Sequence, residues 1–308
     1  MLTAEQVKER QTGLGSSDAG AVLGLNPYQS PLEVYLEKVG ERAPFEGNEQ
    51  TYFGARLEDI IADEYARRTG NAVRRLTRTQ RHPRYPWMLA HPDRSATGLR
   101  TVVECKTADK WLAKEWGPGG ETITDAAESD GIVPQTYVAQ VHHQMAVLDF
   151  SRADLAVLIG GNDFRIYHFE RDPSFEEIMI DIEREFWRNH IEARVPPPPS
   201  VLRDLVELYG TDNGMVMHAD AEIEQACTEL AAVKAVAKEA ESRKDALELR
   251  IKSAMGNAAI LRSLTGRTLA TWKSHNKALL DGHRLQKERP ELAAEFEYKI
   301  KVRPFLLK

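Results

Sequence analysis

Apolar residues recur at helical spacing in several stretches before residue 195. In the stretch 54–69, Leu57, Ile61 and Tyr65 lie four residues apart, and Gly70 follows where such a helix would end. The same reasoning predicts helices at 31–39, 135–148 and 174–193, and a helix that starts at Ser16-Ser17-Asp18. Each of these helices has one apolar face, which needs another element to cover it.

Short apolar runs bounded by turn residues predict the strands that would provide that cover. They lie at 87–90, 102–106, 154–160 and 164–169, and the last two are joined by Gly161-Asn162-Asp163, a hairpin turn signal. Helices and strands therefore mix along the chain. We expect an α/β (α+β) fold, with a mixed central sheet flanked by helices.

Four consecutive prolines at 196–199 interrupt this pattern. Such a run cannot continue a helix and tends to be extended and stiff. It indicates a domain at 1–195, a proline linker at 196–199, and a smaller C-terminal region at 200–308.

The C-terminal region has a different composition. Residues 222–255 are rich in Ala, Glu and Lys, and a seven-residue repeat predicts one long helix. The runs 258–264 and 267–273 predict a hairpin, and short helical pieces around Pro290 precede a strand-like run at 299–307. We expect a helical arm with a β-hairpin, used for oligomerisation or for binding a partner.

The net charge of −6 gives the whole protein no basic footprint for nucleic acid. A local basic cleft can still set the field where a phosphate binds. The two cysteines, Cys105 and Cys227, are too few for a disulfide framework, a zinc ribbon or an iron–sulfur cluster. No apolar run suits a signal peptide or a membrane span, so we expect a cytoplasmic protein with no membrane partner.

The candidate chemistry lies at His91-Pro92-Asp93 and, ten residues later, at Glu104-Cys105-Lys106. Glu104 and Lys106 are two apart in a strand, so their side chains point to the same face. With Asp93 beside them, two carboxylates would bind a hard cation such as Mg²⁺, and Lys106 would orient or deprotonate a water. A surface strand with alternating Glu and Lys would produce the same letters.

Other segments supply further candidates, each with a plainer explanation. Glu58 follows Gly54 on a helix, and it would serve equally as a solvated surface charge. Gln140 and Gln144 share one helical face, where each would also serve as a buried polar residue. The Gly/Ser loop with Ser16 and Ser17 suits a phosphate at a helix start, or merely caps that helix.

These segments resemble the YqaJ-type viral recombinases, which are related to phage lambda exonuclease within the PD-(D/E)xK nucleases. The resemblance is carried by Gly15-Ser16-Ser17-Asp18, Gly54 with Leu57-Glu58, His91-Pro92-Asp93, Glu104-Cys105-Lys106, and Tyr137 with Ala139-Gln140-Val141. Their order and spacing match over residues 10–190. The resemblance implies a restriction-endonuclease-like core and an Mg²⁺-dependent DNA nuclease in which Mn²⁺ substitutes.

Residue roles follow from the resemblance. Asp93 and Glu104 match the metal-binding acids, and Lys106 matches the catalytic lysine. Glu58 matches the helix acid that reaches the metal directly or through water, and Gln140 matches a glutamine near the attacking water.

The resemblance is weaker at Arg10 and Ser17, and the sequence departs from the family pattern at Arg94. Arg10 and Ser17 have a spacing similar to that of the family residues for a 5′ phosphate, although Arg10 also suits an ordinary surface position. Arg94 stands where many relatives have glycine after Pro-Asp, so the turn has to form with a side chain present. That side chain is itself a candidate for a phosphate contact.

Two further stretches suit DNA. Residues 74–84 carry Arg74, Arg75 and Arg78 and suit phosphate binding without sequence choice, or form a solvated loop. Residues 110–116 (KWLAKEW) hold two tryptophans and two lysines just past the candidate strand. The tryptophans suit either stacking on a base or burial in the core.

The sequence and the resemblance together favour a phage-type exonuclease that acts on double-stranded DNA and leaves single-stranded tails for recombination. A homo-oligomer and a single-strand annealing protein are the expected partners. The alternatives are an endonuclease of the same fold, or a non-catalytic DNA-binding or scaffold protein. Strand polarity and the number of metal ions are left open.

Overall fold

The computed structural model describes residues 8–43, 45, 47–298 and 302–307. The chain forms two compact units, of which the first ends at Leu208 and the second begins at Tyr209. The division lies beyond the prolines at 196–199 because the following segment stays bound to the first unit. There, the buried Asp204 side chain accepts hydrogen bonds from the Ser30 hydroxyl (2.7 Å) and from the Ser200 amide (2.9 Å).

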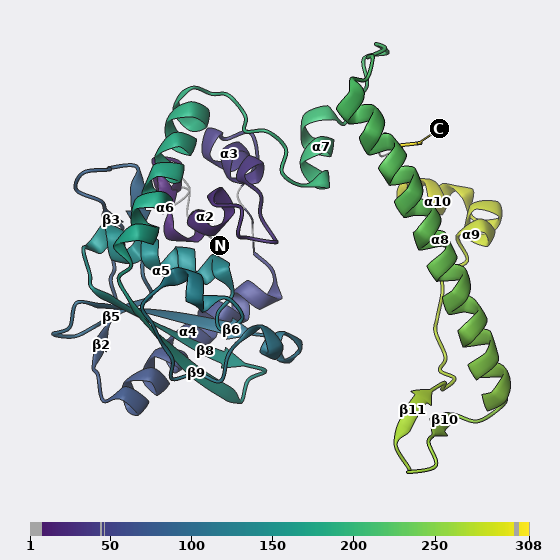
Figure 1. Ribbon diagram of the computed structural model, residues 1–308, viewed down its shortest axis with the longest axis horizontal. Coiled ribbons are helices and arrows are strands. Elements are labelled where there is room, and N and C mark those ends of the chain that lie inside the picture. The colour runs from purple at the N-terminus through teal and green to yellow at the C-terminus, as the bar shows by residue number, and fades with distance from the viewer. Residues whose placement is uncertain (1–7, 44, 46, 299–301, 308) are drawn as a thin grey trace. The chain divides into compact units, whose positions relative to one another are not determined.

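The first unit is built on a mixed six-stranded sheet in the order β2-β5-β6-β8-β9-β7 (Figure 1). The central pair β6–β8 is parallel, and β5 and β9 flank it antiparallel. The strands are β2 (Val73–Arg74), β5 (Arg94–Ala96), β6 (Thr101–Ala108), β7 (Thr122–Ile123), β8 (Arg152–Ile159) and β9 (Asp163–Glu170). The mixed sheet predicted from the apolar runs is confirmed.

A second, three-stranded sheet has the order β1-β4-β3. It contains β1 (Leu14–Gly15), β3 (Gln80–Arg81) and β4 (Met88–Ala90), with β1 parallel and β3 antiparallel to β4. Only β4 was predicted. The other two strands are two residues long, too short to show an alternating pattern.

Helices flank these sheets. They are α2 (Ser16–Val22), α3 (Pro31–Val39), α4 (Glu49–Thr69), α5 (Gln135–Leu148), α6 (Pro173–Phe186) and α7 (Leu202–Tyr209). Two short 3₁₀ helices, η1 (Lys110–Glu115) and η2 (Ala126–Ser129), lie between them, and the π-helix η3 (Trp187–Glu192) continues α6. α3 and α5 have the bounds that the sequence predicts. α4 begins five residues earlier than expected, because the Asn48 side chain caps it by accepting from the Thr51 amide (3.0 Å).

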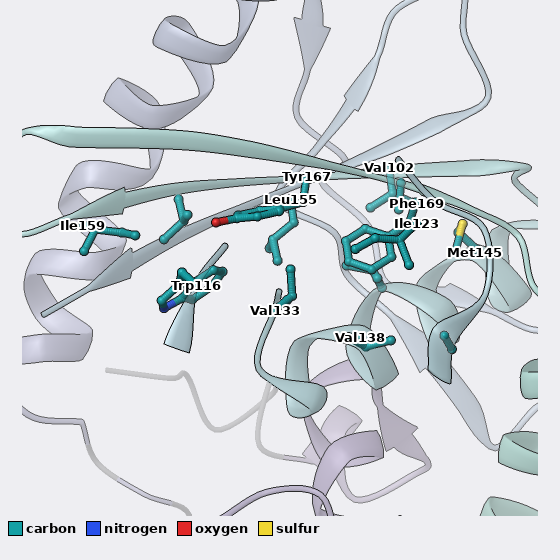
Figure 2. Packing of buried hydrophobic residues seen from close by; sticks show 14 residues of the cluster. Val102, Trp116, Ile123, Val133, Val138, Met145, Leu155, Ile159, Tyr167 and Phe169 are labelled. Atoms are coloured by element: carbon teal, nitrogen blue, oxygen red, sulfur yellow. The ribbon is translucent and has the colours of Figure 1, made fainter. Parts of the chain in front are cut away.

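The largest cluster of buried apolar residues lies between α5 and the six-stranded sheet (Figure 2). Val138 and Met145 come from α5, and Leu155 and Tyr167 come from β8 and β9. Trp116 belongs to the same cluster and is 5% exposed. One of the two tryptophans of the KWLAKEW segment is therefore a core residue.

A buried histidine ties α5 to two neighbours. His143 Nε2 lies 3.0 Å from the Leu89 carbonyl oxygen of β4, and Nδ1 lies 2.8 Å from Glu183 Oε1 of α6. All of these side-chain groups are enclosed. A carbonyl and a carboxylate both accept hydrogen bonds, but a neutral imidazole has only one N–H to donate. The pair of His143 and Glu183 therefore holds one additional proton, so that both contacts are hydrogen bonds.

The second unit contains the long helix that the heptad pattern predicts. It comprises α8 (Ala221–Met255), the hairpin of β10 (Ile260–Arg262) and β11 (Thr268–Thr271), α9 (Gly282–Glu288) and α10 (Pro290–Glu295). The strand expected at 299–307 is wrong in the part that the structure describes, because residues 302–307 form no strand, and 299–301 lie outside the described residues. Among the helices of the described chain, none is both long and apolar enough to cross a membrane.

The His143–Glu183 pair predicts a pH-dependent stability. Burial alone would lower the pKa of His143, but the Glu183 carboxylate raises the pKa above its usual value. The stabilisation is therefore complete below about pH 6.5 and is lost as the pH rises through the folded-state pKa. Denaturant unfolding should show Glu183→Gln less stable than wild type by about 3 kcal/mol at pH 6, the cost of breaking a buried pair.

That difference should shrink as the pH is raised toward 9. A difference between wild type and Glu183→Gln that stays constant, or grows with pH, would contradict a proton held by this pair.

Candidate active site

Strand pairing brings Asp93 of the candidate motif next to β6. The chain leaves β4 through His91 and Pro92, and β5 then pairs antiparallel with β6 in the register Arg94↔Val103. Asp93 therefore lies beside the strand that carries the other candidates. The Cys105 amide donates a hydrogen bond to Asp93 Oδ2 at 2.8 Å, which fixes one carboxylate oxygen.

Glu104 and Lys106 point to the same face of β6, as their spacing predicts. Lys106 Nζ lies 2.7 Å from Glu104 Oε1. Glu104 is only 3% exposed, whereas Lys106 is partly open. Cys105, between them, faces the opposite side and packs with Ile61 and other residues of a separate apolar cluster.

Helix α5 holds Glu104 through two amides. Gln140 Nε2 donates to Glu104 Oε1 at 2.5 Å, and Gln144 Nε2 donates to Glu104 Oε2 at 2.8 Å. Gln144 Nε2 also lies 3.3 Å from the hydroxyl of Ser16 in α2. The sequence placed both glutamines on one helical face but assigned a role only to Gln140, although their four-residue spacing was the signal that they act together.

The surroundings of Asp93 disfavour its charged form. Burial, and then the nearby charge of Glu104, raises the pKa of Asp93 to about 8. Burial alone would lower the pKa of Lys106, but Glu104 and Asp93 raise this pKa above its usual value. Near neutral pH the site thus holds a charged lysine and a carboxylate pair that retains a proton.

Glu58 lies near this pair but is engaged elsewhere. Its Oε1 accepts from Arg94 at 2.5 Å and from Arg75 at 3.3 Å, and the same two arginines bind Asp59. The structure brings Asp93, Glu104, Lys106 and Gln140 together directly. Within the described residues, no group of three or more His, Cys, Asp or Glu side chains has the arrangement of a metal site.

Arg94, which stands where many relatives have glycine, forms the first residue of β5. Its side chain is 5% exposed and fastens this strand to Glu58 and Asp59 of α4. The non-glycine residues with positive φ in the described chain are Asp149 and Arg194, so the turn before β5 demands no left-handed backbone at Arg94. The guanidinium is directed toward α4 and is not part of the cavity wall.

A cavity of about 990 Å³ opens in front of the acids. Its walls include Asp93, Glu104, Gln140, Arg10, Ser16, Ser17, Arg78 and Arg81. Arg74 and Arg75 lie on or next to β2 and do not line it. The basic segment predicted for DNA thus divides between this wall and the surface beside α4.

Arg10 is positioned by a buried ion pair behind the cavity wall. Asp18 Oδ2 lies 2.5 Å from Lys38 Nζ, and Lys38 donates to the Arg10 carbonyl oxygen at 2.9 Å. Arg10 itself lies 3.9 Å from Asp18 Oδ1 and remains half open. Asp18 thereby fixes the segment that carries Arg10 against the start of α2.

The donor set suits a hard divalent cation. Asp93 and Glu104 offer carboxylate oxygens, which Mg²⁺ and Mn²⁺ prefer. Burial first, and then the charge of Glu104, raises the pKa of Asp93, and a dication between the two carboxyl groups would offset both effects. Glu58 would need either to leave its arginines or to act through water.

Comparison with solved structures shows the fold. An alkaline exonuclease (LHK-Exo) from Laribacter hongkongensis superposes with a TM-score of 0.50 at 18% sequence identity, covering 67% of this chain and 100% of that one. The first unit accordingly has the PD-(D/E)xK fold that the sequence predicts.

Comparison with protein sequences shows the family. Residues 6–151 match the model of the YqaJ-like viral recombinase domain. An uncharacterized protein R354 of Acanthamoeba polyphaga mimivirus is 26% identical over 49% of this chain and 27% of its own length. An uncharacterized protein YqaJ of Bacillus subtilis is 31% identical over the whole of this chain and 95% of its own length. The chain belongs to the YqaJ-like viral recombinase family.

Proposed function

We propose that the protein is a metal-dependent nuclease that hydrolyses phosphodiester bonds of DNA. The observation that carries this proposal is the meeting of Asp93, Glu104 and Lys106, with the two acids in the wall of an open cavity and Lys106 bound to Glu104. A protein that merely binds DNA gains little from buried acids that repel phosphate. Two acids and an amine at the same point do suit hydrolysis of a phosphodiester.

In this proposal Asp93 and Glu104 would hold Mg²⁺, and Mn²⁺ would substitute for it. A bound dication supplies Lewis-acid polarisation of the phosphoryl oxygen and lowers the pKa of a coordinated water. Gln140 and Gln144 keep both oxygens of Glu104 in place, so the carboxylate needs little reordering to bind. Glu58, held by Arg94 and Arg75, would reach such an ion only through water.

Lys106 works as a cation. Its pKa is raised by the two acids, so the amine stays protonated and donates hydrogen bonds. Beside Glu104 it can orient a water or stabilise charge that develops on the phosphate. Gln140, 2.5 Å from the same Glu104 oxygen, lines the cavity where that water would lie.

The phosphate backbone has partners along the cavity. Arg10, Arg78, Ser16 and Ser17 line the cavity and offer cationic and hydroxyl donors that bind phosphate without sequence choice. Arg74, Arg75 and Arg94 lie outside this wall, so we assign them to outer contacts or to support. The membership of the family favours an exonuclease on double-stranded DNA that leaves single-stranded tails, works as a homo-oligomer, and passes the tail to an annealing protein.

Lys106→Ala should lower Mg²⁺-dependent cleavage of linear duplex DNA at least ~100-fold, the effect of losing one aligned electrostatic group. DNA binding in a chelator should stay within a few-fold of wild type. Lys252→Ala is the matched control, because Lys252 pairs with Glu248 on the exposed α8 helix. Full activity of Lys106→Ala, or equal loss in both variants, would remove Lys106 from the chemistry.

End-labelled linear DNA and closed circular DNA distinguish an exonuclease from an endonuclease. With Mg²⁺, a linear duplex labelled at one 5′ or one 3′ end should be shortened from an end, and a covalently closed circle should persist. Cleavage of the circle would indicate an endonuclease of the same fold. DNA binding with no cleavage of any substrate in Mg²⁺ or Mn²⁺ would instead support a scaffold protein.

Metal binding should depend on pH through Asp93. The pKa of about 8 means that a cation displaces a proton below that pH, so the Kd for Mn²⁺ should tighten about ten-fold per unit from pH 6 and level off above pH 8. Asp93→Asn should bind weakly and without this slope, whereas Asp63→Asn, at an exposed position of α4, should behave as wild type. Calorimetric titrations at several pH values measure both. Equal slopes in Asp93→Asn and wild type would exclude Asp93 as a ligand.

A further inference from the structure

The second tryptophan of the KWLAKEW segment is left unexplained by the core and by the candidate site. Trp111 is 84% exposed, although Trp116, five residues on, is buried against Tyr137 and Tyr167. Tryptophan is highly buried on average, so an exposed indole between two lysines is a candidate contact surface.

The exposure of Trp111 follows from an anchored turn. Its amide donates to Asp109 Oδ1 at 2.8 Å, and Ala113 of the same η1 turn packs on the main core cluster. Gly160, at φ +58°, lets the β8–β9 turn approach η1, since a Cβ there would lie 3.0 Å from Lys110 Cβ. The turn is fastened on two sides and presents Trp111 to solvent.

The surface around Trp111 borders the catalytic strand. Strand β6 carries Glu104 and Lys106 and ends at Ala108, three residues before Trp111. The turn η1 begins directly after this strand, and Ala108 of β6 and Ala113 of η1 pack on the same core cluster.

Two exposed lysines of the same turn flank Trp111. We call Lys110, Trp111 and Lys114 the aromatic rim. Among the described residues, neither lysine forms an ion pair.

The side chains of the aromatic rim suit one kind of ligand, namely unpaired nucleotides. Flat rings offer stacking to bases of any kind, and unpaired cations offer contacts to phosphates, which is the pairing used to bind single-stranded nucleic acid. A duplex hides the faces of its bases, so only unpaired nucleotides can use exposed rings in this way. We infer that the aromatic rim binds unpaired nucleotides of a DNA strand by stacking on Trp111, an inference that rests on the proposed nuclease function for the presence of DNA.

Binding is measured without metal, so that cleavage plays no part. A short fluorescent single-stranded DNA is titrated with the full-length protein in chelator, and anisotropy gives Kd. Trp111→Ala should bind about ten-fold more weakly than wild type, and Trp111→Phe should recover most of that loss, because phenylalanine still stacks. Trp272→Ala is the matched control, an indole that is 49% exposed in the second unit.

The cations give an independent measurement. Lys114→Gln should reduce the slope of log Kd against log salt by about 0.7, the value for one phosphate contact on a single strand. An equal Kd for wild type and Trp111→Ala, or absence of single-stranded DNA binding by wild type, would overturn the inference. So would a change of oligomeric state in Trp111→Ala by light scattering, which would make the rim a contact between copies of this chain.

These results are distinct from those that test the nuclease proposal. Loss of binding in Trp111→Ala supports the rim even if no DNA is cleaved by wild type. Cleavage by wild type together with an unchanged Kd in Trp111→Ala rejects the rim and leaves the nuclease proposal intact.

Discussion

The site depends on two carboxyl groups held close together inside a protein. Asp93 and Glu104 repel one another, and this repulsion, added to burial, is visible in the raised pKa of Asp93. The fold offsets the cost with donors from three directions, namely the Cys105 amide, the Lys106 ammonium and the amides of Gln140 and Gln144. Such an arrangement has a physical reason if a dication completes it.

Helix α5 is the element that unites the fold with this site. One of its faces supplies core residues such as Val138 and Met145, while Gln140 and Gln144 on another face hold Glu104. His143 fastens the same helix to the Leu89 carbonyl, four residues before Asp93. Packing of α5 therefore fixes the geometry on both sides of the acid pair, which explains why polar groups are tolerated in so enclosed a place.

The sequence predicted the parts of this arrangement that are local. The spacing of Glu104 and Lys106 set their common face, and the apolar stripe of 135–148 gave α5 its bounds. The contacts of Glu58 with Arg94 and Arg75 were not predictable, because they join residues 36 and 17 apart across α4, β5 and the segment after β2. The sequence also did not predict the short strands β1 and β3 or the hydrogen bond from Ser30 to Asp204. These features depend on tertiary contacts, which a local sequence pattern does not encode.

The most direct test of the account is the position of a bound ion. Crystals of the protein soaked with Mn²⁺, measured at a wavelength where manganese scatters anomalously, locate that ion without reference to activity. The account predicts an anomalous peak between the carboxylates of Asp93 and Glu104, with Lys106 and Gln140 beside it. Saturating Mn²⁺ that leaves these two carboxylates free, or that binds only at another surface, would contradict it.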